Sequence, residues 1–196
     1  MSKRIAFLAG LLALVCATAD AQTNMRVRGT ITAIGGETLM VTSREGKELK
    51  FTMPDNVGVS VAKAIKFEDI KPGDYVGVTA KKQADGMLAA MEVHYLPPQV
   101  PSGHIPWDLA PNTTMTNASV EAMVQDTGKR ELTVKYKDGM QKIVVPEGIP
   151  LVRAVPGNRS DLKVGEYVFL VAQVKPDGTM VAARIQVSKD GVKPPM

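Results

Sequence analysis

The sequence predicts an all-β protein made of two small barrels in tandem, and three observations support this class. Short runs that alternate apolar and polar residues fill most of the chain after residue 24, as strands with one buried face do. Turn pairs rich in glycine and aspartate separate these runs at short intervals. The stretch DIKPGDYVGVTA at residues 69–80 also recurs as DLKVGEYVFLVA at residues 161–172. Such self-similarity indicates a duplicated structural unit.

The first 21 residues do not belong to this pattern. A basic start, KR at residues 3–4, precedes the apolar run IAFLAGLLALVCA and then the small residues TADAQ. This order is typical of a secretory signal peptide, with cleavage after Ala21 or, as the alternative, after Ala19. We therefore expect residues 1–21 to be removed and the mature protein to be soluble, either periplasmic or secreted.

The charge of the mature chain limits its partners. Without the signal, the chain loses two of its 24 basic and one of its 20 acidic residues, which leaves 22 against 19, a net charge of +3. So small an excess disfavours nucleic-acid binding but suits contact with an anionic polymer or protein of the cell envelope. The only cysteine, Cys16, lies in the signal, and the bulky Val15 before it disfavours a lipid anchor. No later apolar run reaches the about 20 residues of a transmembrane segment.

The duplication has a constant spacing. Five landmarks recur 92 residues later: Pro54, Asp69, Gly73, Tyr75 and the turn at residues 85–86. Shared composition alone would let such landmarks drift, so the spacing indicates a tandem repeat. Upstream, the spacing becomes 93, where RVRGTI of the first copy faces SVEAMV of the second. One inserted residue explains the change.

Each copy is predicted to form five strands. In the first copy, alternation predicts strands over residues 25–34, 37–43 and 47–53, a fourth strand that begins at Tyr75, and a fifth over residues 87–95. Glycine turns separate them, and Pro54 ends the third strand because it has no N–H to donate. The second copy repeats the plan, with turns at residues 137–139, 163–166 and 176–178.

A long connection follows the third strand of each copy, over residues 54–72 and 146–164, with room for a short helix or 3-10 turn such as VAKAIKF. Five strands with this connection predict an oligonucleotide/oligosaccharide-binding (OB)-like barrel, with an SH3-like barrel as the alternative. The expected domains are therefore barrels at residues 25–96 and 116–188, a proline-rich linker at 97–115 and a tail at 189–196. Because each barrel is small, we expect the two to pack together.

Three patterns of the mature chain resemble a known group of proteins. They are G-x-[IV]-x-x-I early in the repeat, D-[IL]-K-x-G-[DE]-Y-V-x-[VL] in its middle, and D-G with paired alanines late. Together they resemble an uncharacterised family of exported bacterial domains of unknown function, built as small tandem β-barrels. The segment GHIPWDLAPNTTMTNA at residues 103–118 is similar to a stretch in exported proteins that automated naming calls metal-transporter components. The resemblance implies a fold and export, and no catalytic residues.

The sequence contains no catalytic motif. Neither G-x-S-x-G, H-E-x-x-H nor a phosphate-binding glycine loop occurs. The prediction is therefore a non-enzymatic binding or scaffold protein of the cell envelope. An oligosaccharide-binding barrel is one alternative, although aromatic residues for stacking are only 5% of the chain.

A second alternative is a periplasmic copper(I) protein. Thioether and imidazole groups are ligands that copper(I) accepts, and ten methionines remain after Met1. The candidate ligands are Met91, His94, His104 and Met115, although their spacing matches no metal motif. Core filling is the other interpretation of the methionines. No other cofactor is expected.

The linker at residues 97–115 holds five prolines, which stiffen a chain rather than let it act as a flexible tether. It also contains Ile105, Trp107 and Asp108, and Trp107 is the only tryptophan. Burial of an indole stabilises a protein substantially. We therefore expect these three residues to contact and orient the two barrels, or, as the alternative, to anchor a partner protein.

Overall fold

The computed structural model describes residues 23–195, so the expected signal peptide lies outside the described residues. The first repeat contains β1 (Thr23–Gly35), β2 (Thr38–Ser43), β3 (Glu48–Thr52), β4 (Gly58–Ala64), the 3-10 turn η1 (Phe67–Asp69), β5 (Tyr75–Lys82) and β6 (Leu88–Tyr95). β7 (Gly103–Trp107) lies between the repeats. The second repeat contains β8 (Thr113–Asp126), β9 (Lys129–Tyr136), β10 (Gly139–Val144), β11 (Leu151–Pro156), η2 (Arg159–Asp161), β12 (Tyr167–Val174) and β13 (Met180–Val187).

The all-β class is confirmed, because strands and two single 3-10 turns make up the regular structure of residues 23–195. The predicted boundaries of the first copy agree with β1, β2, β3, β5 and β6 to within two residues. The long connections contain the predicted 3-10 turns, η1 and η2, although η1 begins only at Phe67, the last residue of VAKAIKF. The predicted count of five strands was wrong, because each connection also forms a strand, β4 or β11, and each copy therefore has six strands.

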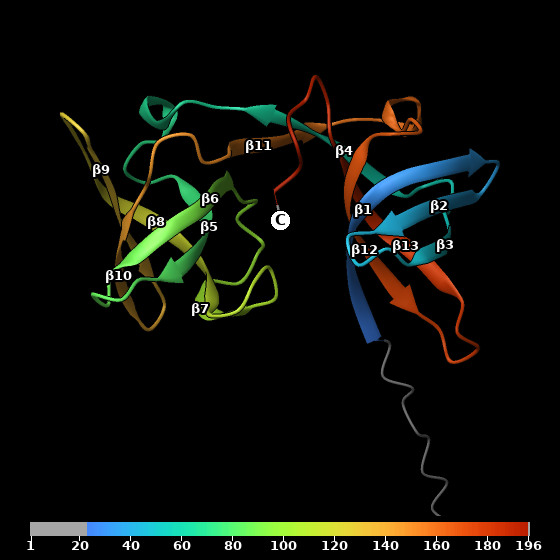
Figure 1. The fold of residues 1–196 in the computed structure, drawn as a ribbon, viewed down its shortest axis with the longest axis horizontal. Helices are drawn as coiled ribbons and strands as arrows, with labels where there is room; N and C mark the ends of the chain where they lie inside the picture. Colours follow the sequence, from blue (N-terminus) through green and yellow to red (C-terminus); the bar gives the residue numbers. More distant parts are fainter. Residues whose placement is uncertain (1–22, 196) are drawn as a thin grey trace, which may run out of the picture.

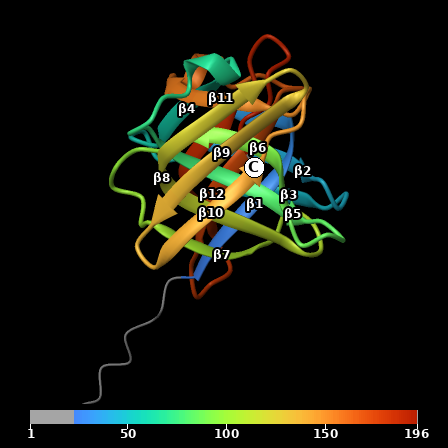
Figure 2. The ribbon, with the colours of Figure 1, turned by 90° about the vertical axis from the view of Figure 1, so that its left-hand side faces the viewer.

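Five strands close into a first ring, the barrel on the left in Figure 1. The order is β10-β9-β8-β5-β6, and the ring closes through the parallel pairing of β6 with β10 at Leu88↔Ile143 and Ala89↔Val144. Figure 2 views this ring from outside, with β8, β9 and β10 crossing the front. Its buried cluster includes Val78 and Val93 from the first repeat and Leu132 and Ile143 from the second.

The second ring has the same plan. Its order is β13-β12-β1-β2-β3, and β13 meets β3 in parallel at Val181↔Thr52. Its buried cluster again mixes the repeats, with Leu39 and Phe51 from the first and Leu170 and Ile185 from the second. Each ring therefore takes three strands from one repeat and two from the other.

This exchange differs from the expectation that residues 25–96 form one barrel and residues 116–188 another. β1 pairs with β12 of the other repeat, and β5 pairs with β8 of the other repeat. The exchange is carried by β4 and β11, which pair antiparallel with each other and lead the chain from one ring to the other across the top of Figure 1. The last two strands of each copy therefore complete the ring that the first three strands of the other copy begin.

The expected linker is partly ordered as strand. β7 pairs antiparallel with the first half of β8, with Ile105 opposite Met115 and Trp107 opposite Thr113. After β13, the described tail turns back through the bridge Lys189↔Val192, and its residues Pro194 and Pro195 are buried. Among the described residues, no helix is long and apolar enough to cross a membrane.

Candidate functional site: a cleft between the two rings

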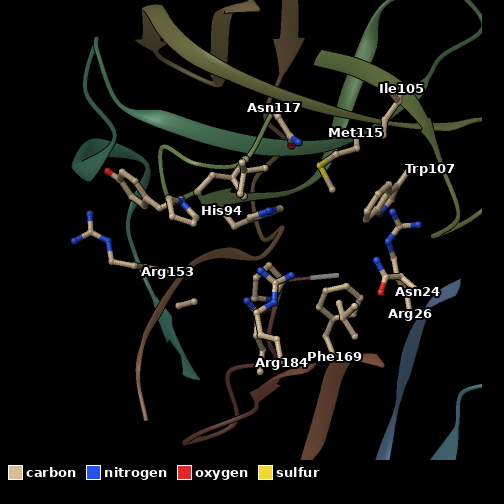
Figure 3. A pocket seen from close by; sticks show the side chains of 18 residues that line it. Asn24, Arg26, His94, Ile105, Trp107, Met115, Asn117, Arg153, Phe169 and Arg184 are labelled. Atoms are coloured by element: carbon tan, nitrogen blue, oxygen red, sulfur yellow. The ribbon is translucent and has the colours of Figure 1, made fainter. Parts of the chain in front are cut away.

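A cavity of about 740 Å³ lies between the two rings. One wall is formed by β6, β7 and β8, which contribute His94, Trp107 and Met115, and the opposite wall by β1, β12 and β13. β11 contributes Arg153, and the tail contributes Pro195. Figure 3 shows these side chains converging on the space. Its volume lies within the range of about 300–1,000 Å³ that is usual for sites of small ligands.

Three arginines face this cleft: Arg26 on β1, Arg153 on β11 and Arg184 on β13. No aspartate or glutamate belongs to the lining that residues 23–195 form. Guanidinium groups stay charged at all relevant pH values, so the cleft concentrates positive charge. Arginines that gather in this way produce a field that attracts anions.

Two of the arginines are held against aromatic rings. The guanidinium carbon of Arg26 lies 4.5 Å from the centre of the Trp107 ring, and that of Arg153 lies 4.1 Å from the centre of the Tyr95 ring. Stacking of this kind is favourable and fixes the plane of the guanidinium, while its N–H groups point outward in that plane. Arg26 and Arg153 are thus oriented in advance.

Arg184 is the least compensated of the three. Its side chain makes no hydrogen bond or ion pair within residues 23–195. Burial between the rings lowers the pKa of Arg184 below its usual value. Its side chain is nevertheless accessible to solvent from the cleft. A charge that is partly removed from water and lacks a counter-ion is a group that an anionic ligand can stabilise.

Next to the cleft, the residues that follow β7 are joined to the second ring by an ion pair and hydrogen bonds at Asp108. Arg28 on β1, whose side chain is only 3% exposed, donates a hydrogen bond of 2.8 Å to Asp108 Oδ1. Arg44, in the turn between β2 and β3, donates to the carbonyl oxygens of Asp108 and Leu109 at 2.9 Å each. Trp107, the residue before Asp108, lies against Arg26. The segment at residues 107–109 therefore joins the two rings on the side opposite Arg153.

The ion pair of Arg28 with Asp108 leads to a prediction about the dependence of stability on pH. Burial alone would raise the pKa of Asp108, but the hydrogen bond from Arg28 and the charges of Arg28 and Arg26 outweigh it and lower that pKa below 3.8. A lowered carboxyl pKa contributes stability that is complete above the unfolded-state pKa and is lost as the pH falls through the folded-state pKa. Because Asp108 is half exposed, we expect a contribution of only about 1 kcal/mol.

Urea unfolding from pH 7 to pH 2.5 tests this prediction. The free energy of unfolding of wild type should exceed that of Asp108→Asn at pH 7, and the difference should shrink once the pH falls below about 3.8. A difference that stays constant over this range would contradict the assignment of the carboxylate as the titrating group.

His94, which lines the cleft, lies against a buried acid. Glu92 is 2% exposed, and its Oε1 lies 3.2 Å from His94 Nδ1 and 3.3 Å from Thr79 Oγ1. Gly77 makes room for this arrangement, since a Cβ there would stand 2.5 Å from His94 Nε2. His94 belongs to the lining of the cleft, and Glu92 does not.

The four candidate metal ligands do not come together. His94 and Met115 line the cleft, whereas Met91 and His104 do not. His104 lies on β7 with its Nδ1 2.8 Å from Thr116 Oγ1, and its ring stacks on Tyr136. Burial lowers the pKa of His104. Within residues 23–195, no group of three or more His, Cys, Asp and Glu side chains is arranged to hold a metal ion.

The three predicted contact residues of the linker lie at the cleft or beside it. Ile105 and Trp107 line it, and Asp108 pairs with Arg28. Sequence reasoning missed the three arginines. Each one reads as an ordinary outward-facing residue of a strand, and only the exchange of strands between the repeats brings them to one cavity.

Comparison with known proteins adds one match. Residues 28–94 match the family model of a domain of unknown function, DUF5666. The matched segment runs from β1 to β6 and therefore contributes strands to both rings. No curated protein and no solved structure matches the chain.

Proposed function

We propose that this protein is a non-enzymatic binding protein whose cleft takes up a small anionic ligand. The observation that carries the proposal is the convergence of Arg26, Arg153 and Arg184 on one cavity whose described lining holds no carboxylate. Two of these guanidinium groups are stacked on aromatic rings before any ligand arrives. A ligand therefore meets oriented donors and loses less free energy to their ordering.

The ring topology supports the further proposal that each barrel is of the OB-like type. In one ring, β8, β9 and β10 are followed by β6 and β5 of the other repeat, and in the other ring, β1, β2 and β3 are followed by β13 and β12. The rings close through parallel pairs, β10 with β6 and β3 with β13. This order fits a small Greek-key barrel of the kind that binds oligosaccharides.

The setting belongs to the proposal as well. The basic and apolar character of residues 3–21 supports export, and the absence of cysteine from residues 22–196 suits an oxidising compartment such as the periplasm. A polymer or protein of the cell envelope is then the source of the ligand or partner.

Copper(I) binding remains the second candidate because His94 and Met115 share the cleft. Glu92 lies at the Nδ1 side of His94, as the carboxylates that orient metal-binding histidines do. The three arginines oppose the approach of a cation, so we rank this function below anion binding.

Substitution of Arg184 tests the proposal. Arg184→Gln should weaken binding of an anionic probe about ten- to a hundredfold, the effect of losing one charged hydrogen bond. Lys175→Gln, on the exposed turn after β12, removes the same charge outside the cleft and should leave affinity almost unchanged. Fluorescence of Trp107, the only tryptophan, reports binding of citrate, inorganic triphosphate or galacturonate oligomers at low salt. Equal affinities of the two variants for every bound probe would refute the cleft as an anion site.

A further inference from the structure

We propose that the ligand of the cleft is a short acidic oligosaccharide, a chain of sugar units that carry carboxylate groups. This inference rests on the proposed anion-binding function and narrows it to a chemical class. Three features of the cleft carry it: the spread of the arginines, the neutral polar groups between them, and the apolar surface that separates these groups.

The arginines are spread along the cavity rather than gathered at one point. In Figure 3, Arg153 and Arg26 enter from opposite sides, and Arg184 stands between them. A single compact anion cannot use donors on opposite sides of a cavity of about 740 Å³. A chain with a charged group on each unit can. Stacked guanidinium groups also leave their N–H edges for planar, bidentate acceptors, and a carboxylate is such an acceptor.

The neutral amide groups of the cleft favour a ligand that has hydroxyl donors. The amides of Asn24, Asn117 and Gln186 line the same cavity. Gln186 Oε1 is enclosed by protein atoms and has no hydrogen-bond partner within residues 23–195, so a ligand reaches it only after the amide turns toward the cavity. An amide oxygen needs a donor, and an ionised carboxylate cannot supply one, because it only accepts. The hydroxyl groups of a sugar ring donate as well as accept.

Apolar side chains fill the space between these polar groups. Val171 and Phe169 on one wall and Ile105 and Met115 on the other contribute to the lining. The C–H faces of sugar rings are apolar and pack on such surfaces, whereas a bare inorganic anion gains nothing from them. The cleft thus combines the three surfaces that an acidic sugar presents.

Three probes on the full mature chain distinguish the ligand class from anion binding in general. Trigalacturonate carries carboxylates and hydroxyls, its methyl ester keeps the hydroxyls without the charge, and propane-1,2,3-tricarboxylate keeps the charge without hydroxyls. Calorimetry and Trp107 fluorescence should show trigalacturonate binding at least tenfold more tightly than either of the others. Gln186→Met should weaken trigalacturonate binding about fivefold and leave the tricarboxylate unaffected, while Lys175→Gln serves as the control for both.

The outcomes separate the two proposals. If the tricarboxylate binds as tightly as trigalacturonate and Gln186→Met changes neither affinity, the sugar class is wrong while anion binding stands. If the methyl ester binds as tightly as the acid, or if no probe gives saturable binding, both proposals fail. Thermal unfolding of each variant, with a midpoint close to that of wild type, shows that any loss of binding comes from the cleft.

Discussion

Two halves of the chain, cut after Gln99 in the loop between β6 and β7, are expected to stay unfolded when separate and to form the native structure when mixed. Each half holds three strands of one ring and two of the other, so neither half contains a ring as it occurs in the intact protein. The first half alone would leave Leu39 and Phe51 without Leu170 and Ile185, which cover them in the second ring.

The free energies involved are large enough to decide the outcome. Burial of one valine, leucine or isoleucine side chain contributes about 1.5–3 kcal/mol. The second repeat supplies Val168, Leu170, Ile185 and Val187 to the core of the second ring, all fully buried. Their loss removes roughly as much free energy as the whole stability of a typical domain, about 5–15 kcal/mol.

Circular dichroism and amide NMR spectra of each half and of the equimolar mixture measure the effect. The separate halves should show no cooperative unfolding, and the mixture should reproduce the dispersed spectrum of the intact chain. A monomeric half with cooperative unfolding would contradict this prediction, because it would mean that one repeat closes a barrel with its own five strands.

The limits of sequence reasoning lie in this same exchange. Alternation and glycine turns located β1, β2, β3, β5 and β6 well, because those signals are local to each strand. They did not locate β4. Two adjacent residues of this strand, Val61 and Ala62, are buried and the residues on either side of them are not, so apolar and polar positions do not alternate. They also could not choose the partner of β1, since β5 of its own repeat and β12 of the other have a similar apolar pattern and share Tyr, Val and Ala at three equivalent positions.

The candidate site was predictable only in part. The linker stood out because of its prolines and Trp107, and the structure places Trp107 against Arg26 at the cleft. Arg153 and Arg184 carried no such signal. They lie 31 residues apart in sequence, on strands that belong to different parts of the fold, and their common cavity exists only once the rings are assembled.

The spacing of 93 predicted for the first strands was wrong. Thr30 of β1 pairs with Tyr167 and Ser119 of β8 pairs with Tyr75, so these two strands correspond at a spacing of 89. Their irregularities in register lie at equivalent places, since residues 31–33 of β1 and 120–122 of β8 also differ by 89. The spacing returns to 93 at β2 and β9, because the hairpin of β8 and β9 is longer. Gly29 therefore corresponds to Ala118, and only the first repeat has a glycine at this position.

Gly29→Ala is therefore expected to destabilise the protein by about 3 kcal/mol, because a side chain at this position has no room. A Cβ on Gly29 would stand 2.2 Å from the carbonyl oxygen of Thr42, 2.8 Å from Val41 Cγ1 and 2.9 Å from Ser43 Cα. Two of these atoms belong to the backbone of β2, which cannot move aside without breaking its pairing with β1. For a protein of this size, the loss lowers Tm by roughly 10 °C.

Gly35→Ala is the matched control, since Gly35 lies on the same strand, has no positive φ, and a Cβ there would meet nothing within 4 Å. At such a position the exchange should change stability by less than about 1 kcal/mol, and in the stabilising direction, because alanine restricts the unfolded chain. Urea unfolding of both variants measures the contrast. If Gly29→Ala were as stable as Gly35→Ala, β2 would have to yield at residues 41–43, and the close approach of β1 and β2 would not be what requires glycine in the first repeat.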